Sequence, residues 1–428
     1  MMRMNLYLAF VLFMLVGNLA LDWIVARLNL SRLDSRLPDE FFGFYDQEKY
    51  ARAQNYTRER TRFGLFHSSI TTAVTLLVIL SGGFNLVDRL ARSLVSGPVL
   101  TGLVFTFALT VLSGLLSLPF SIYSTFVIEA RYGFNRTTVK TFVLDLLKSL
   151  LLAILIGAPL LALVLWLFGA AGKAAWLVVW IAVTGFQLFM TYLAPVIIMP
   201  WFNRFTLLEE GELKSKVEAY ARGQGFKLKG IFKMDGSRRS SKANAFFTGF
   251  GRYRRIVLFD TLIEKHSSDE LLAVLAHEIG HFKLGHIPKL MIASIVHTGL
   301  LLFLLSLFIR NPGLSAAFKM EHLSIYASLV FFGFLYSPIS TILSVAMNCL
   351  SRRHEFEADR YSARTTGTPG AFITALKRLS VDSLTNLTPH PLKVFLEYSH
   401  PPILQRIIAL RTLCCDSDRE DPAVRLQT

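Results

Sequence analysis

The fourteen residues AVLAHEIGHFKLGH, at positions 273–286, place three histidines and a glutamate among apolar residues. His277 and His281 are four residues apart, so on a helix both imidazoles project from one face, about one turn apart. That is the separation that two ligands of one tetrahedral zinc ion require. Glu278 lies beside the first histidine and can act as general base on a water molecule at the metal, which is the HExxH arrangement. Ser267 and Glu270 have capping-box spacing, which predicts that a helix begins there and carries the motif.

A zinc site of this kind needs a third protein ligand and an open position for water. His286 is the nearest candidate. It lies five residues after His281, whereas the HExxHxxGxxH pattern has its third histidine six residues after the second. The spacing therefore favours a helix-end role for His286 over a ligand role.

A better third ligand lies in RRHEFEADRYSA, residues 352–363. Glu355 and Asp359 are four residues apart and share a helix face, whereas Glu357 points to another face. The Glu355 carboxylate would complete a site of two histidines and one glutamate, and Asp359 would accept a hydrogen bond from a ligand imidazole. His354 is a rival ligand, and the whole stretch could also be a charged helix next to a membrane.

The composition around these motifs is that of a membrane protein. Of the 428 residues, 53% are hydrophobic and only 18% are charged. The formal net charge of +15 is compatible with nucleic-acid binding, but basic residues also accumulate in the cytoplasmic loops of membrane proteins, and we expect no nucleic-acid partner. Cys349, Cys414 and Cys415 form no CxxC pair, so neither a disulfide framework nor a cysteine metal site is indicated.

A helix needs about 20 apolar residues to cross a bilayer. Several of the stretches that meet this length contain Gly or Pro, such as Pro195 and Pro338, which membrane helices tolerate where neighbouring helices or a cavity satisfy the freed backbone groups. Seven spans are predicted, at roughly 5–24, 65–87, 98–123, 149–170, 175–200, 288–309 and 324–350.

Lysine and arginine set the expected orientation. With the amino terminus outside, the loops at 25–64 and 126–148 are cytoplasmic and carry eight and four Lys/Arg, against two, one and two in the opposing loops. Two spans separate His281 from Glu355, so both would lie at the cytoplasmic face of the membrane. The first apolar segment could instead be a cleaved signal peptide, which would invert the spans that follow.

The expected fold is an all-α multi-span membrane protein with a small α+β zinc-protease domain at the cytoplasmic face. Four parts are predicted: 1–200 as an amino-terminal membrane region of five helices, 201–287 as a protease domain with an edge strand and the HExxH helix, 288–350 as helices six and seven, and 351–428 as the carboxy-terminal part of the protease domain.

Within the long loop, local patterns predict regular structure. Residues 211–224 have helical spacing of charged and apolar side chains. Residues 242–260 predict two short strands joined by a turn at Gly249 and Gly251.

Together with the two metal motifs, three further stretches resemble the integral-membrane zinc endopeptidases that include the type I CAAX prenyl proteases. They are EARYGFNRTT at 129–138, ANAFFTGFG at 243–251 and LTPHPLKVFLEYSHPPILQRI at 387–407. The resemblance covers nearly the whole chain, and its HExxH…ExxxD site is similar to that of the gluzincins. Ile279 and Phe282 stand where Leu and Trp are common, and neither touches the chemistry. The resemblance implies seven membrane helices around a large internal chamber, with the zinc facing that chamber.

The resemblance also implies roles for the metal-site residues. His277, His281 and Glu355 would bind one zinc ion per chain, and Glu278 would activate water. Asp359 would orient a ligand histidine.

Further roles are implied outside the metal site. His400 and Arg406 would stabilise the oxyanion of the reaction. By residue pattern alone, His400 could equally be a turn residue before two prolines, and Arg406 a solvated charge. Asn244 and Ala245 would lie on an edge strand whose backbone pairs with an extended substrate, although this stretch could also be a buried hairpin.

The expected function is hydrolysis of peptide bonds near the carboxy terminus of prenylated CAAX-type or related membrane-associated substrates. One alternative is a membrane quality-control protease of heat-shock type, a class with fewer spans. Another is a transporter or channel with a structural HExxH, which polar residues in or near spans, such as His67, Asn85 and Asp88, keep open. The tail PAVRLQT has no lysine-based retrieval signal, so a bacterial inner membrane is expected.

Overall fold

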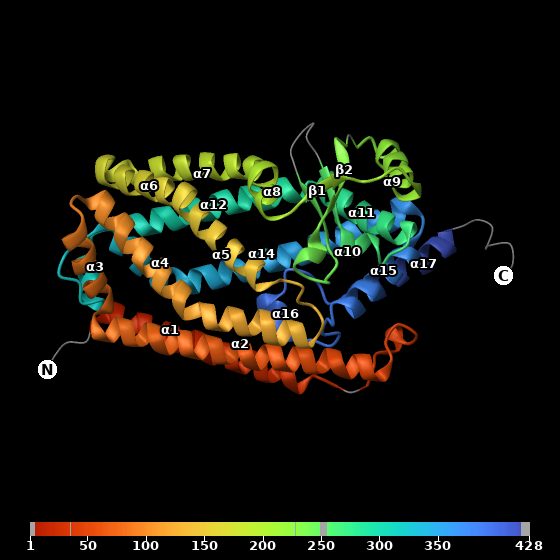
Figure 1. Ribbon diagram of the computed structural model, residues 1–428, viewed down its shortest axis with the longest axis horizontal. Helices are drawn as coiled ribbons and strands as arrows, with labels where there is room; N and C mark the ends of the chain where they lie inside the picture. The colour runs from red at the N-terminus through yellow and green to blue at the C-terminus, as the bar shows by residue number, and fades with distance from the viewer. Residues whose placement is uncertain (1–4, 35, 227, 249–254, 421–428) are drawn as a thin grey trace.

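A computed structural model describes residues 5–34, 36–226, 228–248 and 255–420, and these residues are mostly helical. Seven helical segments within the described ranges are long and apolar enough to cross a membrane, which confirms the predicted number. Long helices fill one end of the molecule, and the strands gather at the other with α9–α11, α15 and α17 (Figure 1). The segments are Leu6–Ser31, Gln47–Ser81, Pro98–Glu129, Val139–Ala170, Gly172–Phe202, His286–Ser306 and Ile325–Thr366.

The described part of the amino-terminal half contains eight α-helices. They are α1 (Leu6–Ser31), α2 (Gln47–Ser81), α3 (Gly83–Leu94), α4 (Pro98–Tyr123), α5 (Val139–Leu152), α6 (Ala158–Ala170), α7 (Ala175–Leu193) and α8 (Met199–Phe202). The predicted second span, 65–87, extended too far, because Gly82 takes a left-handed φ of 80° and separates α2 from α3.

The described part of the carboxy-terminal half contains four strands and nine helices. They are β1 (Phe205–Leu207), α9 (Glu212–Gly223), β2 (Gly230–Met234), β3 (Ala245–Thr248), β4 (Arg255–Phe259), α10 (Asp260–Ile263), α11 (Ser268–Lys283), α12 (His286–Ser306), α13 (Pro312–Ala317), α14 (Ile325–Thr366), α15 (Pro369–Asp382), α16 (Pro391–Glu397) and α17 (Ile403–Glu420).

The Gly and Pro residues inside the spans coincide with local changes in helix geometry. One π-helical turn, Ala153–Gly157, joins α5 to α6 just before Pro159, and another, Ala194–Ile198, contains Pro195. Proline lacks the N–H that an α-helix needs, and a π-turn redistributes the remaining backbone hydrogen bonds. The spans therefore continue through these residues, as membrane helices can.

Little of each of the seven spans is buried within the molecule. The share of buried residues in their most apolar windows ranges only from 0 to 17%. Membrane helices present much of their apolar surface to lipid rather than to a protein core, so low burial is expected of these spans.

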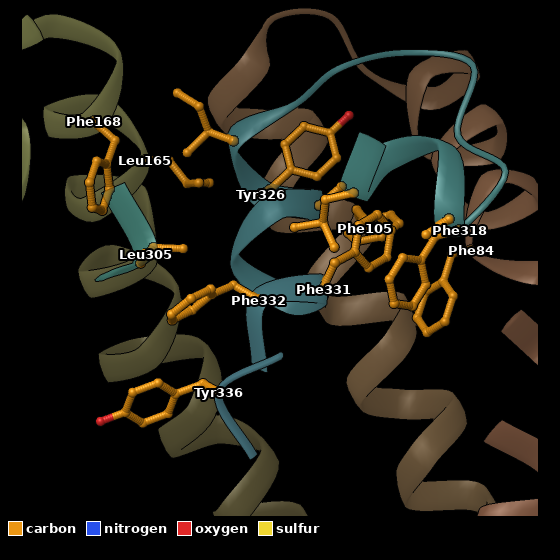
Figure 2. Close-up of a cluster of buried hydrophobic side chains, with 14 of the residues drawn as sticks. Phe84, Phe105, Leu165, Phe168, Leu305, Phe318, Tyr326, Phe331, Phe332 and Tyr336 are labelled. Carbon is orange, nitrogen blue, oxygen red and sulfur yellow. The ribbon is translucent and has the colours of Figure 1, made fainter. Parts of the chain in front are cut away.

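One aromatic cluster holds the spans together away from the strands. Phe318 and Phe331 stack with centroids 3.8 Å apart, and Phe84 packs edge-on against both. Figure 2 shows these rings beside Phe105 and the tyrosine ring of Tyr326 on α14. The cluster joins α3 to two spans, α4 and α14, that lie far apart in sequence, and fixes them at one point.

The four strands form one sheet in the order β1-β2-β4-β3, with β2 and β4 parallel and the other pairs antiparallel. The two strands predicted within 242–260 are confirmed as β3 and β4, with Ala245 opposite Leu258. The predicted turn at Gly249 and Gly251 lies outside the described residues. Among the described strands β3 pairs only with β4, so within the described part of the chain its other edge is open for a further strand.

The last span continues well beyond the predicted membrane segment. α14 runs for 42 residues, from Ile325 to Thr366, with Pro338 inside it. The expected boundary at residue 350 therefore falls within a helix. The seventh span and the ExxxD motif therefore belong to one continuous helix.

We predict that Gly102 on α4 is needed for this helix packing. A Cβ there would lie 2.6 Å from Cδ1 of Leu165 and 3.0 Å from Cβ of Tyr326, so α6 or α14 would have to move. Gly102→Ala should lower the stability of the protein in detergent by about 1–3 kcal/mol, measured by thermal unfolding. Gly114→Ala on the same helix meets nothing within 4 Å and is the matched control. Equal thermal midpoints for the two variants would contradict this packing.

Candidate active site

Helix α11 carries the HExxH residues and lies between the sheet on one side and α14 on the other. Ser267 caps its first turn, with the side chain of Glu270 closing the predicted capping box. Leu271, Leu275 and Ile279 recur every four residues and pack into the core that lies against the sheet. The opposite face, which carries the histidines, is thereby turned toward α14.

The approach of α11 to α14 depends on small side chains. A Cβ at Gly280 would lie only 3.0 Å from Cδ1 of Tyr361 on α14, so the glycine permits close contact. The buried hydroxyl of Ser362 donates a 2.7 Å hydrogen bond to the backbone oxygen of Ala273. This bond fixes the position of one helix along the other, and with it the position of Glu355 relative to the histidines.

Three side chains from these helices converge. The Nε2 atoms of His277 and His281 are 3.1 Å apart. Oε2 of Glu355 lies 3.6 Å from Nε2 of His277, and Oε1 lies 3.3 Å from Nε2 of His281. These three side chains, which the sequence singled out as candidate zinc ligands, offer ligand atoms within 4.8 Å of one another and could hold one metal ion.

The geometry of this group fits a tetrahedral ion. Ligand atoms about 2.05 Å from such an ion lie about 3.3 Å from one another, close to the spacing observed between the three side chains. The ring planes of His277 and His281 are inclined by 81°, so their Nε2 lone pairs can meet at one point. Oε2 of Glu355 is buried and accepts no well-formed hydrogen bond from the described residues, and Nη1 of Arg406 lies 3.3 Å from it. Its remaining lone pairs can bind a cation.

Asp359 lies behind His277, as expected from its spacing with Glu355. Its Oδ1 is 2.8 Å from Nδ1 of His277, although the two groups are not aligned as a well-formed hydrogen bond. Arg406 on α17 holds the same carboxylate with two bonds, Nε to Oδ2 at 2.8 Å and Nη2 to Oδ1 at 2.5 Å. A bidentate pair of this kind is a strong, directional interaction. It fixes Asp359 and occupies most of the Arg406 guanidinium.

Glu278 faces a cavity of about 480 Å³ beside the metal-site residues. Burial raises the pKa of the Glu278 carboxyl group, and the two neighbouring histidines only partly oppose this effect. A carboxylate with a raised pKa is a better proton acceptor than an ordinary glutamate at neutral pH.

The remaining predicted site residues line the same cavity. Asn244, Ala245, His400 and Arg406 are all part of its wall. Nε2 of His400 lies 3.3 Å from Oε1 of Glu355, and its side chain is 66% exposed, so it can reach a bound molecule. Ala245 begins the edge strand β3. The tertiary structure therefore brings together every residue that the sequence singled out for this site.

Two further residues belong to the site and were not assigned a role there from the sequence. His286, the first residue of α12, is fully buried, with Nδ1 3.1 Å from Nδ1 of His281. Glu357 accepts a hydrogen bond at 3.0 Å from Nε2 of His286. Gly285 was a signal in the sequence, because a glycine at a helix end permits the left-handed turn, with a φ of 69°, that the structure shows between α11 and α12.

The polar residues that allowed a transporter or channel as an alternative function have structural partners. The buried Asp88 pairs with Arg92 at 2.8 Å and with the hydroxyl of Tyr326. Asn85 accepts a hydrogen bond from the backbone of Glu321, and His67 stacks on the ring of Phe120. Each contact is expected of residues that hold helices together.

The sequence was compared with known families and proteins. Residues 26–204 match the model described as CAAX prenyl protease N-terminal, five membrane helices, and residues 207–414 match peptidase family M48. CAAX prenyl protease 1 of Saccharomyces cerevisiae is 36% identical over 88% of this chain and 89% of its own length. The CAAX prenyl protease 1 homologs of Oryza sativa and Homo sapiens are 34% and 32% identical, over 90% and 89% of this chain and 92% and 89% of their own lengths.

The fold is also found in a solved structure. The crystal structure of S. mikatae Ste24p superposes with a TM-score of 0.90 at 33% sequence identity, covering 94% of this chain and 99% of the other. The likeness extends over both the membrane helices and the strand-containing end.

We predict that Glu355 is required for metal binding and Glu278 is not. Glu355→Ala should weaken binding of zinc by more than about 100-fold, because it removes the only carboxylate of the ligand set. Glu278→Gln keeps the size of its side chain and all three ligands, and it should retain about one zinc ion per chain. Metal content of the purified variants, determined by atomic emission, tests this. Equal zinc content in the two variants would exclude the assignment.

Proposed function

The chain belongs to peptidase family M48 and is an integral, multi-pass membrane metalloendopeptidase, and we propose that it uses zinc to cleave prenylated CAAX-type substrates near their carboxy terminus. The observation that carries the zinc proposal is the convergence of His277, His281 and Glu355 at one corner of a cavity. The relatives named CAAX prenyl protease 1 support the choice of substrate.

In the proposed reaction the ligands would be His277, His281 and Glu355. A zinc ion bound there would polarise the scissile carbonyl and lower the pKa of a water molecule. Glu278 would take the proton of the attacking water and later give it to the leaving amine. Its position in the cavity wall and its raised pKa support both roles.

We assign the stabilisation of negative charge on the carbonyl oxygen chiefly to His400. Its side chain is accessible, and Ser399 contacts its Nδ1 at 3.0 Å, leaving Nε2 directed toward Glu355 and the cavity. Arg406 would contribute its positive charge, since Nε and Nη2 are held by Asp359 and Nη1 lies 3.3 Å from Oε2 of Glu355. Preorganised donors of this kind act on charge that develops only in the transition state.

The substrate would bind as an added strand on β3. Asn244 and Ala245 stand where the open edge of β3 meets the cavity. The Asn244 side chain accepts a 2.9 Å hydrogen bond from the backbone N–H of Ala245, so this N–H is within reach of a hydrogen-bond acceptor. An extended peptide would replace that contact and be held by backbone bonds, which require little of its sequence.

The setting of the site leads to further proposals. The excess of Lys/Arg in the loops at 25–64 and 126–148 supports a site on the cytoplasmic side of the membrane. The apolar residues of the cavity, such as Phe372, Leu376 and Ile403, suit substrates whose residues around the cleaved bond are hydrophobic. A lipid-modified substrate would be concentrated at this membrane surface. The compared relatives from rice, yeast and humans do not test the expectation of a bacterial inner membrane.

The alternative function is that of a membrane quality-control protease, and experiment can distinguish it from a prenyl protease by the substrates that are cleaved. It would degrade misfolded membrane proteins, whether or not they carry lipid. The match of residues 26–204 to a five-helix amino-terminal domain supports the prenyl-protease assignment instead.

The central prediction concerns cleavage of a farnesylated CAAX peptide by the purified protein. Cleavage should occur, stop on addition of a zinc chelator, and return when zinc is restored. Glu278→Gln should lower kcat by at least about 100-fold while retaining its metal, because the general base is lost. Product analysis by mass spectrometry is the measurement. Full activity of Glu278→Gln would disprove the mechanism, and cleavage of unprenylated membrane proteins alone would favour the alternative.

A second prediction concerns His400. Replacing it by alanine should lower kcat by about 100-fold or more with little change in KM, because a donor to the oxyanion acts mainly in the transition state. His322→Ala, at an exposed position in the loop between α13 and α14, is the matched control and should leave kcat unchanged. A rise in KM at constant kcat would instead identify His400 as a substrate-binding residue.

A further inference from the structure

His286 forms a short chain of contacts that begins at a metal-site histidine. Its Nδ1 is 3.1 Å from Nδ1 of His281, and its Nε2 is 3.0 Å from Oε2 of Glu357. The ring is fully buried, and the left-handed turn at Gly285 brings it back against α11. Arg353 in turn donates to Oε1 of Glu357 at 3.0 Å. The chain thus runs from His281 through His286 to a carboxylate that is itself held in place.

The protons in this chain can be arranged in only one way if His281 binds a metal. Nε2 of His281 faces His277 and Glu355, so a neutral ligand imidazole carries its proton on Nδ1. Nδ1 of His286 then has to accept that proton's hydrogen bond, which places the proton of His286 on Nε2. Nε2 donates to the Glu357 carboxylate, which can only accept. Both hydrogen bonds, from His281 to His286 and from His286 to Glu357, are thus satisfied without conflict.

We propose that His286 is a positioning residue that fixes the tautomer and ring orientation of His281, with Glu357 holding His286 in turn. The two metal-site histidines would thus be supported differently. His277 has Asp359 directly behind it, whereas His281 reaches its carboxylate through a second imidazole. This inference rests on the proposed zinc site and adds a support on the side of His281.

A second metal site is the rival explanation for the same residues. His286, His354 and Glu357 offer ligand atoms within 4.8 Å of one another. However, the rings of His286 and His354 are stacked, 4.0 Å between centroids and inclined by only 7°. A metal ion lies close to the plane of each imidazole that binds it, and two nearly parallel stacked planes offer no common point at about 2.0–2.1 Å from both nitrogens. The geometry therefore assigns His354 to packing against His286.

The test measures metal binding rather than activity. In the purified full-length protein, zinc affinity is determined by competition with a chromophoric chelator, and the site is also examined by the absorption spectrum of the cobalt-substituted form. His286→Ala should weaken zinc binding by about 10–100-fold and change the cobalt spectrum. His286→Gln should restore most of both, because its amide offers one acceptor to His281 and one donor to Glu357.

His354→Phe is the matched control, because it preserves the stacked ring and removes both nitrogens. We expect one zinc ion per chain and an unchanged cobalt spectrum in this variant. Two ions in the unmodified protein, one of them lost in His354→Phe, would overturn the proposal in favour of a second metal site. Unchanged zinc affinity and cobalt spectrum in His286→Ala would also overturn it.

A third variant covers the case in which His286→Ala does not fold. Glu357→Ala alters a partly exposed side chain, and it should weaken zinc binding and change the cobalt spectrum in the same direction as His286→Ala. Wild-type values for Glu357→Ala would then overturn the proposal. Absence of zinc from the unmodified protein is a different result, because it contradicts the proposed function itself.

Discussion

The buried carboxylates of α14 impose the constraint around which the catalytic end of the molecule is built. Glu355 and Asp359 are 4% and 2% exposed, and an uncompensated buried charge costs several kcal/mol. Compensation comes from residues far away in sequence. Arg406 binds Asp359 with two bonds and lies 3.3 Å from Glu355, while His277 and His281 approach from α11. Satisfying these two charges draws α11, α14 and α17 together and thereby forms the cavity.

The same helix connects this cavity to the membrane. α14 passes from the aromatic cluster around Phe331 to Asp359 without a break. Residues of one helix keep a defined separation, because each residue adds about 1.5 Å along the helix axis. The site is consequently held at a fixed distance from the membrane-spanning part, where a protease for membrane-associated substrates needs it.

Each buried polar group at the site is held by another polar group behind it. The side chains that face the cavity are supported by Asp359 and His286, which are supported in turn by Arg406 and Glu357. In a low-dielectric interior such contacts are strong, and a missing partner is costly. This arrangement accounts for the burial of Arg406 and His286, two residues whose types are usually found at least partly exposed.

Features that depend on local spacing and composition can be predicted from the amino-acid sequence. The seven apolar segments, the capped helix at Ser267, the strands β3 and β4, and the facing of His277 with His281 all follow from patterns within short windows. Only the tertiary structure decided that α14 is one helix through residue 350, that Arg406 is tied to Asp359, and that His286 supports His281. The physical reason is that burial and pairing of these groups involve residues tens of positions apart, which no local periodicity encodes.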